Sequence, residues 1–179
     1  HKDFPTLEEI TAEKAYVESF GAAAKNTRYL PWVMEKLGKY EGCAIGHEAP
    51  EIVGKDTLGN ELKLSDLRGN YVLVDFWNSY CHWCREETPA LKRALEHFAG
   101  KNFKILGVSS DRVKKLWMDA IHEDGSYWDH LMLEKGDDVM DRYCIKGIPH
   151  IILVGPDGKI LAKELRGQDL IDVPDQFVK

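Results

Sequence analysis

One short stretch constrains the fold more than any other, because it joins an apolar strand directly to a helix that begins with two cysteines. Residues 71–77 form an apolar run with the β-branched and aromatic content of a buried strand. A polar turn, residues 78–80, then leads to Cys81 and Cys84 at the start of a predicted helix that carries apolar residues at helical spacing as far as Phe98.

The spacing of the two cysteines indicates redox chemistry. Cys81 and Cys84 are three residues apart, so one helical turn brings both sulfurs to the same end of the helix. The exposed N–H groups of a helix N-terminus favour negative charge, which predicts a pKa for Cys81 below the free value of about 8.5. We interpret Cys81 as the nucleophile and Cys84 as the resolving thiol of a dithiol–disulfide exchange.

The same spacing occurs in zinc and iron–sulfur sites, which need two more ligands at matching positions. The remaining cysteines, Cys43 and Cys144, stand alone, and no His-x-x-x-His pair accompanies them. His82, between the active cysteines, could be a third ligand, but we interpret it as tuning the Cys81 thiolate. We therefore predict no metal site and no bound cofactor.

Residues 74–77, the two cysteines and Pro89 together resemble the active-site segment of the thioredoxin superfamily. Arg85 and Glu87 add a resemblance to its TlpA/ResA-like branch of extracytoplasmic thiol–disulfide oxidoreductases. Residues 147–149, Gly-Ile-Pro, are similar to the family's cis-proline loop. The resemblance covers roughly residue 46 to the end of the chain, and two distant motifs in the right order make it specific.

The resemblance implies a substrate surface beside the dithiol. A cis peptide bond before Pro149 would leave the Ile148 backbone free to pair with an extended substrate segment. Trp83 takes a place where the family usually has proline, and its ring offers apolar surface to a partner. The open alternative is a trans Pro149 that begins an edge strand.

Asp75 is the predicted proton carrier of the site. It lies mid-strand, where burial of an ionised carboxylate is costly and raises its pKa, which suits the transfer of a proton to or from Cys84 through water. Thioredoxins often place a lysine opposite this acid, but the predicted neighbouring strand, residues 105–108, has none. The alternative is an acid that faces water at a sheet edge.

Strands alternate with helices after residue 46, which predicts an α/β protein. We expect a thioredoxin-like domain over residues 46–179, with a mixed central sheet flanked by helices. Residues 1–45 are predicted to be an N-terminal helical segment. Its first helix opens with a capping box at Thr6 and Glu9 and extends to about Lys25. This segment is too short to own a core, and we interpret its helices as packing elements without chemistry.

The charge and hydropathy of the chain limit the classes of partner that it can have. The net charge of −6 and the lack of a basic run argue against nucleic acid, and no stretch approaches the about 18 apolar residues of a membrane span. The chain begins at His1 without a signal-like region, so we expect a processed protein, its export signal or anchor removed, that works outside the cytoplasm, in a periplasm. The resemblance implies protein disulfide or dithiol substrates and a membrane-linked electron donor.

The predicted function is therefore thiol–disulfide oxidoreduction, in the reducing rather than the oxidising direction. A peroxiredoxin-like thiol peroxidase is one alternative, although the Thr/Ser-x-x-Cys setting of such enzymes is missing around Ser79 and Cys81. A non-catalytic thioredoxin-fold binding module is the other, and the intact dithiol argues against it.

The two leftover cysteines allow two readings. A bridge between Cys43 and Cys144 would close a long loop, provided that their Cα atoms come within roughly 7 Å. Cys144 also lies beside Tyr143 and Ile145, where a small buried thiol is ordinary. We predict two unpaired, unreactive thiols.

Overall fold

A seven-stranded mixed sheet forms the centre of the computed structural model, which describes residues 5–21, 27 and 29–179. The strand order is β2-β1-β5-β4-β3-β6-β7. The strands are β1 (Val53–Asp56), β2 (Glu61–Lys63), β3 (Tyr71–Trp77), β4 (Phe103–Ser109), β5 (Asp129–Met132), β6 (His150–Val154) and β7 (Ile160–Ala162). β3 pairs in parallel with β4 and antiparallel with β6, so the predicted mixed sheet is confirmed, and β6 and β7 form an antiparallel pair at one edge.

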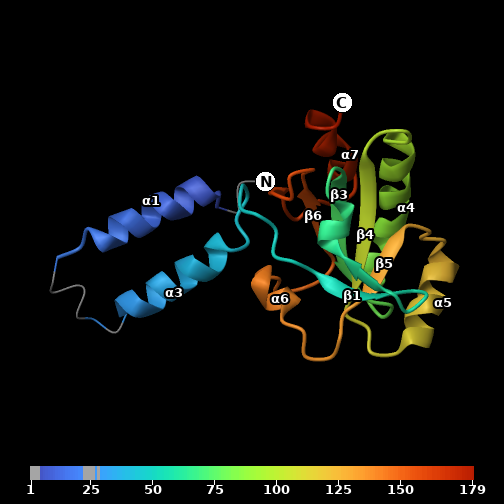
Figure 1. The fold of residues 1–179 in the computed structure, drawn as a ribbon, viewed down its shortest axis with the longest axis horizontal. Coiled ribbons are helices and arrows are strands. Elements are labelled where there is room, and N and C mark those ends of the chain that lie inside the picture. Colours follow the sequence, from blue (N-terminus) through green and yellow to red (C-terminus); the bar gives the residue numbers. More distant parts are fainter. Residues whose placement is uncertain (1–4, 22–26, 28) are drawn as a thin grey trace.

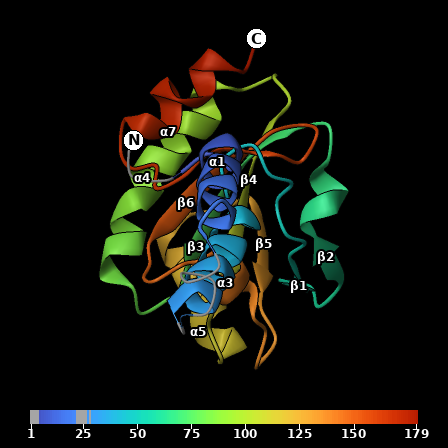
Figure 2. The ribbon, with the colours of Figure 1, turned by 90° about the vertical axis from the view of Figure 1, so that its left-hand side faces the viewer.

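Helices cover both faces of this sheet. One face carries α4 (His82–His97), α5 (Lys114–Asp124), α7 (Asp169–Asp172) and the 3₁₀ turn η2 (Pro174–Gln176). The other carries α6 (Val139–Arg142) and the turn η1 (Leu64–Leu67). Figure 2 shows α4 and α7 on one side of the strands. The predicted α/β architecture is confirmed.

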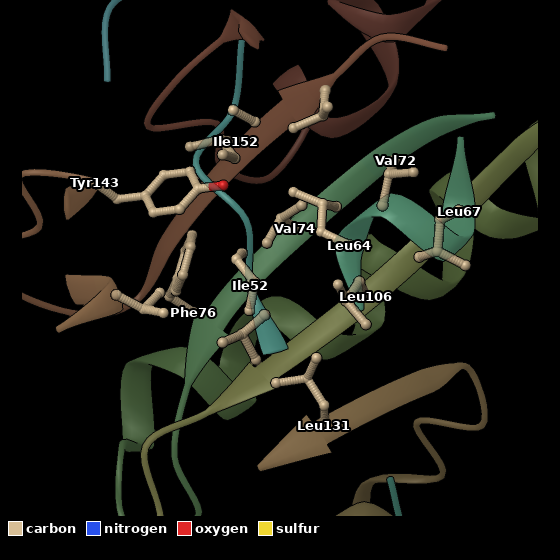
Figure 3. Packing of buried hydrophobic residues seen from close by; sticks show 14 of the residues in the cluster. Ile52, Leu64, Leu67, Val72, Val74, Phe76, Leu106, Leu131, Tyr143 and Ile152 are labelled. Carbon is tan, nitrogen blue, oxygen red and sulfur yellow. The ribbon is translucent and has the colours of Figure 1, made fainter. Parts of the chain in front are cut away.

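Strand β3 is buried on both faces, and its side chains alternate between two cores. Val72, Val74 and Phe76 pack toward α6 and η1. Leu73 packs toward α4 and α7, and Trp77 packs with α5. Figure 3 shows the first of these cores, where the ring of Tyr143 meets Phe76 and Ile152.

The N-terminal helices lie beside each other and extend away from the sheet (Figure 1). They are α1 (Leu7–Glu18) and α3 (Tyr29–Glu41). The capping box at Thr6 is confirmed, since the Glu9 amide donates to Thr6 Oγ1 at 3.2 Å and the Thr6 amide donates to Glu9 Oε2 at 2.7 Å. The helix ends at Glu18, earlier than predicted, and residues 22–26 of the predicted range lie outside the described part.

Side chains of the sheet domain contact this helical pair and the turn after it. Lys163 donates to the carbonyl of Cys43 at 3.0 Å, and the Cys144 thiol donates to the carbonyl of Lys39 at 3.5 Å. At the junction, Thr6 forms a bridge with Ile45, and the Gly46 amide donates to the carbonyl of Ile160 at 2.8 Å. Within the described ranges, no helix has both the length and the apolar character to cross a membrane.

A glycine in β4 makes room for a histidine in β5. Gly107 pairs with Asp75 on one side and with His130 on the other, so all three project toward the same face. A Cβ atom at Gly107 would lie 2.2 Å from His130 Nδ1 and 3.1 Å from Trp77 Nε1. His130 occupies the space that a side chain of β4 would otherwise fill.

We predict that Gly107→Ala destabilises the chain by about 1–3 kcal/mol, the usual cost of overpacking a buried site. Chemical denaturation measures this loss. Gly38→Ala is the control, because no atom lies within 4 Å of the added Cβ and alanine favours a helix interior. Equal effects of the two substitutions would contradict the packing argument.

Candidate active site

The two cysteines lie at the junction between β3 and α4. Cys81 is the N-cap residue of α4, and its Sγ accepts a hydrogen bond from the Cys84 amide at 3.1 Å. The two sulfurs form a disulfide of 2.00 Å, with Cα atoms 5.2 Å apart. Cys81 is half-buried, whereas Cys84 is only 2% exposed. Solvent therefore reaches the first sulfur and not the second.

A buried carboxylate holds the turn before Cys81. Asp111 Oδ2 accepts from the Ser79 amide at 2.9 Å, and Asp111 Oδ1 accepts from the Ser79 hydroxyl at 2.7 Å. The Ser109 hydroxyl donates to the same carboxylate at 2.7 Å. Sequence reasoning missed Asp111, because its partners come from a turn more than thirty residues earlier in the chain.

Arg85 fixes the orientation of α4 against α5. Its guanidinium donates two hydrogen bonds to the Asp124 carboxylate, at 2.8 and 2.6 Å, and one to Glu123 at 2.8 Å. This fork geometry is stronger and more directional than a single ion pair. The first turn of α4, which carries both cysteines, is therefore anchored one residue after Cys84.

Asp75 is buried, 4% exposed, so the alternative of a water-facing edge acid is wrong. Its Oδ1 has no hydrogen-bond partner in the described part of the chain. Burial raises the pKa of Asp75 to about 7, the nearby charge of Arg166 opposes this rise, and the charge of Glu87 adds to it. Gly107 lies opposite Asp75 in the register, so the absence of a facing lysine is confirmed.

A loop after β7 closes over the site, and sequence reasoning did not identify it. The Arg166 guanidinium donates to the carbonyl of Pro149, and the Gly167 amide donates to Glu87 Oε2 at 2.9 Å. The segment that follows β7 is thus tied to both α4 and the proline loop. Glu87 stood out in the sequence only through its resemblance to a family motif, and nothing singled out Arg166.

The proline loop adjoins the dithiol. The peptide bond between Ile148 and Pro149 is cis. The half-buried side chain of Ile148 packs on the same cluster as Cys81, Cys84 and Trp77. His150, which follows Pro149, is 4% exposed. Burial together with the charges of Lys163 and Arg166 lowers the pKa of His150 to about 4.

Asp75, Gly107 and His130 lie side by side on neighbouring strands, and His130 is the last of the three. Its Nε2 bonds to the carbonyl of Ser126 at 2.8 Å, so this nitrogen carries the proton and Nδ1 is the unprotonated one. Burial lowers the pKa of His130 to about 4, which keeps the ring neutral. Nδ1 has no partner among the described residues, and it faces the space above Gly107.

Two side chains predicted to act at the site lie on its outer surface. His82 is exposed, and its Nε2 lies 3.1 Å from Glu86 Oε1. Trp83 is 69% exposed and, with Tyr80 at 70%, presents aromatic surface beside Cys81. The described residues contain no group of three or more side chains arranged to hold a metal ion.

A mixed sheet, a dithiol at a helix N-terminus and a cis-proline loop packed beside it define a thioredoxin-fold oxidoreductase. The chain belongs to the AhpC/TSA family, whose profile matches residues 45–163. The predicted thioredoxin fold and the TlpA/ResA-like resemblance are both confirmed by the relatives.

Relatives in sequence and in structure carry thiol–disulfide names. The chain is similar to the thioredoxin domain of a thiol–disulfide oxidoreductase from Bacteroides vulgatus, with 53% identity and a TM-score of 0.74 over 76% of this chain and 99% of that one. A thiol:disulfide interchange protein from Bacteroides sp. shares 52% identity, with a TM-score of 0.73 over 76% and 91% of the chains. Thiol-disulfide oxidoreductase ResA of Bacillus subtilis is 29% identical over 68% of this chain and 67% of that one. The chain is a thioredoxin-like protein disulfide oxidoreductase.

We predict that, after reduction, alkylation modifies Cys81 at least tenfold faster than Cys84 (about 1.4 kcal/mol per tenfold). Cys81 is half-buried whereas Cys84 is only 2% exposed, and the Cys81 sulfur accepts from a helix N-terminal amide. Quenched alkylation with peptide mass spectrometry measures both rates in one sample. Comparable rates for the two thiols would contradict this assignment, and unfolded chain supplies the control in which the difference disappears.

Proposed function

We propose that this chain reduces protein disulfides through Cys81 and Cys84. The Cys81 thiolate attacks one sulfur of the substrate disulfide and expels the other as a thiol, which leaves a mixed disulfide. Cys84 then attacks Cys81 Sγ, the second substrate thiol leaves, and the Cys81–Cys84 disulfide forms. The observation that carries the proposal is the contrast in exposure, with Cys81 half-buried and Cys84 only 2% exposed.

Asp75 is proposed to accept the proton of Cys84 as that thiol becomes the nucleophile. A pKa of about 7 suits a group that must both take and give up a proton near neutral pH. The carboxylate lies on the face of β3 that also carries Trp77, whose ring packs with Cys84. Its free oxygen is available to bond a bridging water.

Trp83, Ile148 and Pro149 are proposed to bind the substrate. An extended polypeptide segment would pair with the backbone before the cis proline and rest on the exposed ring of Trp83. The Arg166 bond to the Pro149 carbonyl supports this loop from behind. His82 is proposed to tune the dithiol weakly, since it is exposed and paired with Glu86.

We propose net reduction outside the cytoplasm, in a periplasm, with a membrane-linked protein dithiol as electron donor. The extracytoplasmic location of ResA-like homologues supports the proposed location. Residues 46–179 would form the catalytic domain and residues 1–45 a separate helical segment. The extension of α1 and α3 away from the sheet supports that division (Figure 1).

Thiol peroxidase activity is the rival hypothesis, because peroxiredoxins share the thioredoxin fold of this AhpC/TSA family member. Parallel assays of insulin reduction and peroxide consumption separate the two. We expect insulin reduction that Cys81→Ser abolishes, whereas Cys84→Ser accumulates mixed disulfides between Cys81 and the substrate. Peroxide consumption that survives Cys84→Ser, without insulin reduction, would overturn the proposal. The absence of both activities, with the dithiol intact, would favour a binding module.

Asp75→Asn should slow release of the mixed disulfide and flatten its pH dependence around neutrality, because the variant lacks the proton acceptor. Single-turnover kinetics against pH measure both effects. The conservative variant Asp75→Glu should retain part of the pH dependence. A wild-type pH profile in Asp75→Asn would retire the role.

The same substitution has an opposite effect on stability. Since the pKa of Asp75 is raised from 3.8 to about 7, the folded chain holds this proton more tightly than the unfolded chain, and stability falls as pH rises between these values. Asn mimics the protonated form, so the variant should gain on the order of 2–4 kcal/mol relative to wild type at about pH 8 and little at about pH 4. Denaturation at the two pH values measures this difference, and an equal change at both would contradict it.

A further inference from the structure

The second cysteine pair, Cys43 and Cys144, comes together in the fold although the two residues are far apart in sequence. Both thiols donate to the carbonyl of Lys39, at 3.8 Å from Cys43 and 3.5 Å from Cys144. The two thiols are close enough that Cys144 contributes to the raised pKa of Cys43. They are unpaired, as predicted. Their proximity, however, removes the reason to expect them to be unreactive.

Cys144 occupies a position that normally belongs to glycine. The amide of Ile145 donates to Met140 at 2.8 Å, and that of Cys144 donates to Asp141 at 3.0 Å, which is the Schellman ending of helix α6. Its C′ residue takes a left-handed conformation, and Cys144 does so with φ of 56°. A cysteine is costlier than glycine at such a position, and here it directs a thiol toward α3.

Lys163 holds both cysteine-bearing turns in place. This side chain is 5% exposed, and its ammonium donates to the carbonyl of Cys43 at 3.0 Å and to the carbonyl of Tyr143 at 3.3 Å. Burial raises the pKa of Cys43 to about 12, and the charge of Lys163 opposes that rise. The ammonium thus positions the two turns and favours the Cys43 thiolate when it forms.

The two thiols differ in access. Cys43 is 2% exposed. Cys144 is half-buried and lines a cavity of about 950 Å³ between α3 and the sheet domain, with room for a small molecule. An incoming disulfide can therefore meet Cys144 first, with Cys43 enclosed behind it.

We propose that Cys43 and Cys144 form a second redox-active cysteine pair, which takes a low-molecular-weight disulfide as oxidant. The Cys144 thiolate attacks one sulfur of that disulfide, forms a mixed disulfide and releases one small thiol. Cys43 then loses its proton and attacks Cys144 Sγ, so that the second small thiol leaves and the Cys43–Cys144 disulfide forms. Two protein thiols are oxidised and one small disulfide is reduced to two thiols. The bridge joins the N-terminal segment covalently to the sheet domain.

This inference is independent of the proposed function of Cys81 and Cys84, and the test keeps the two apart. The full chain carrying Cys81→Ser and Cys84→Ser is equilibrated in buffers of oxidised and reduced glutathione, acid-quenched, alkylated and mapped by peptide mass spectrometry. We expect alkylation to be lost at Cys43 and Cys144 together, with a linked peptide pair that reduction releases.

Single-cysteine variants of this background are the matched controls. Cys43→Ser should leave Cys144 as a glutathione mixed disulfide, because the resolving thiol is missing. Cys144→Ser should leave Cys43 reduced, because it is enclosed. The proposal is overturned if both cysteines stay alkylatable under every buffer, or if Cys144 keeps glutathione while Cys43 is present.

Thermal unfolding supplies a readout that does not depend on peptide mapping. Oxidation should raise the unfolding midpoint of the chain that keeps Cys43 and Cys144, because the bridge restricts the unfolded state. The Cys43→Ser chain should show no such rise. A midpoint that falls on oxidation would mean that the native positions of the two sulfurs do not suit a disulfide, and would contradict the geometry.

Discussion

Burial of β3 on both faces is the constraint on which the rest of the structure depends. A strand enclosed by α4 and α7 on one side and by α6 on the other leaves solvent access only at its ends. The carboxyl end of β3 leads into the turn before Cys81. The reactive sulfur therefore lies at one of the two ends of the strand that solvent can reach. Asp111 and Arg85 then hold the turn and the helix in that position.

The same burial sets the electrostatics of the site. Burial raises the pKa of Asp75 toward neutrality, and Gly107, its partner in β4, leaves space for the uncharged ring of His130. Arg166 acts from the loop after β7 and opposes the rise, while Glu87 reinforces it. The pKa of Asp75 thus depends on its burial in β3 and on the charges of Arg166 and Glu87, which come from separate parts of the chain. A lysine in place of Gly107 would favour the ionised form and displace the histidine.

The sequence predicted those parts of the fold and site that depend on local pattern. The strand before Cys81, the capping box at Thr6 and the mixed sheet follow from apolar periodicity and turn chemistry. Asp75 was predictable because a carboxylate in an apolar run is conspicuous. Asp111 and Arg166 were not, because their partners lie far away in sequence. No local pattern reports which loop closes over a site, since that depends on the packing of α4, β7 and the proline loop.

The contacts of the N-terminal segment likewise leave no local pattern in the sequence. Considered alone, α1 and α3 are helices of 12 and 13 residues, and their sequence gives no reason to assign them chemistry. Lys163 changes this reading, because an ammonium buried at the end of β7 must find acceptors, and the carbonyls of Cys43 and Tyr143 supply them. The need to satisfy one buried charge therefore brings the end of α3 against the end of α6. The two thiols meet as a consequence of that contact, and the helical segment becomes part of the surface on which thiol chemistry can act.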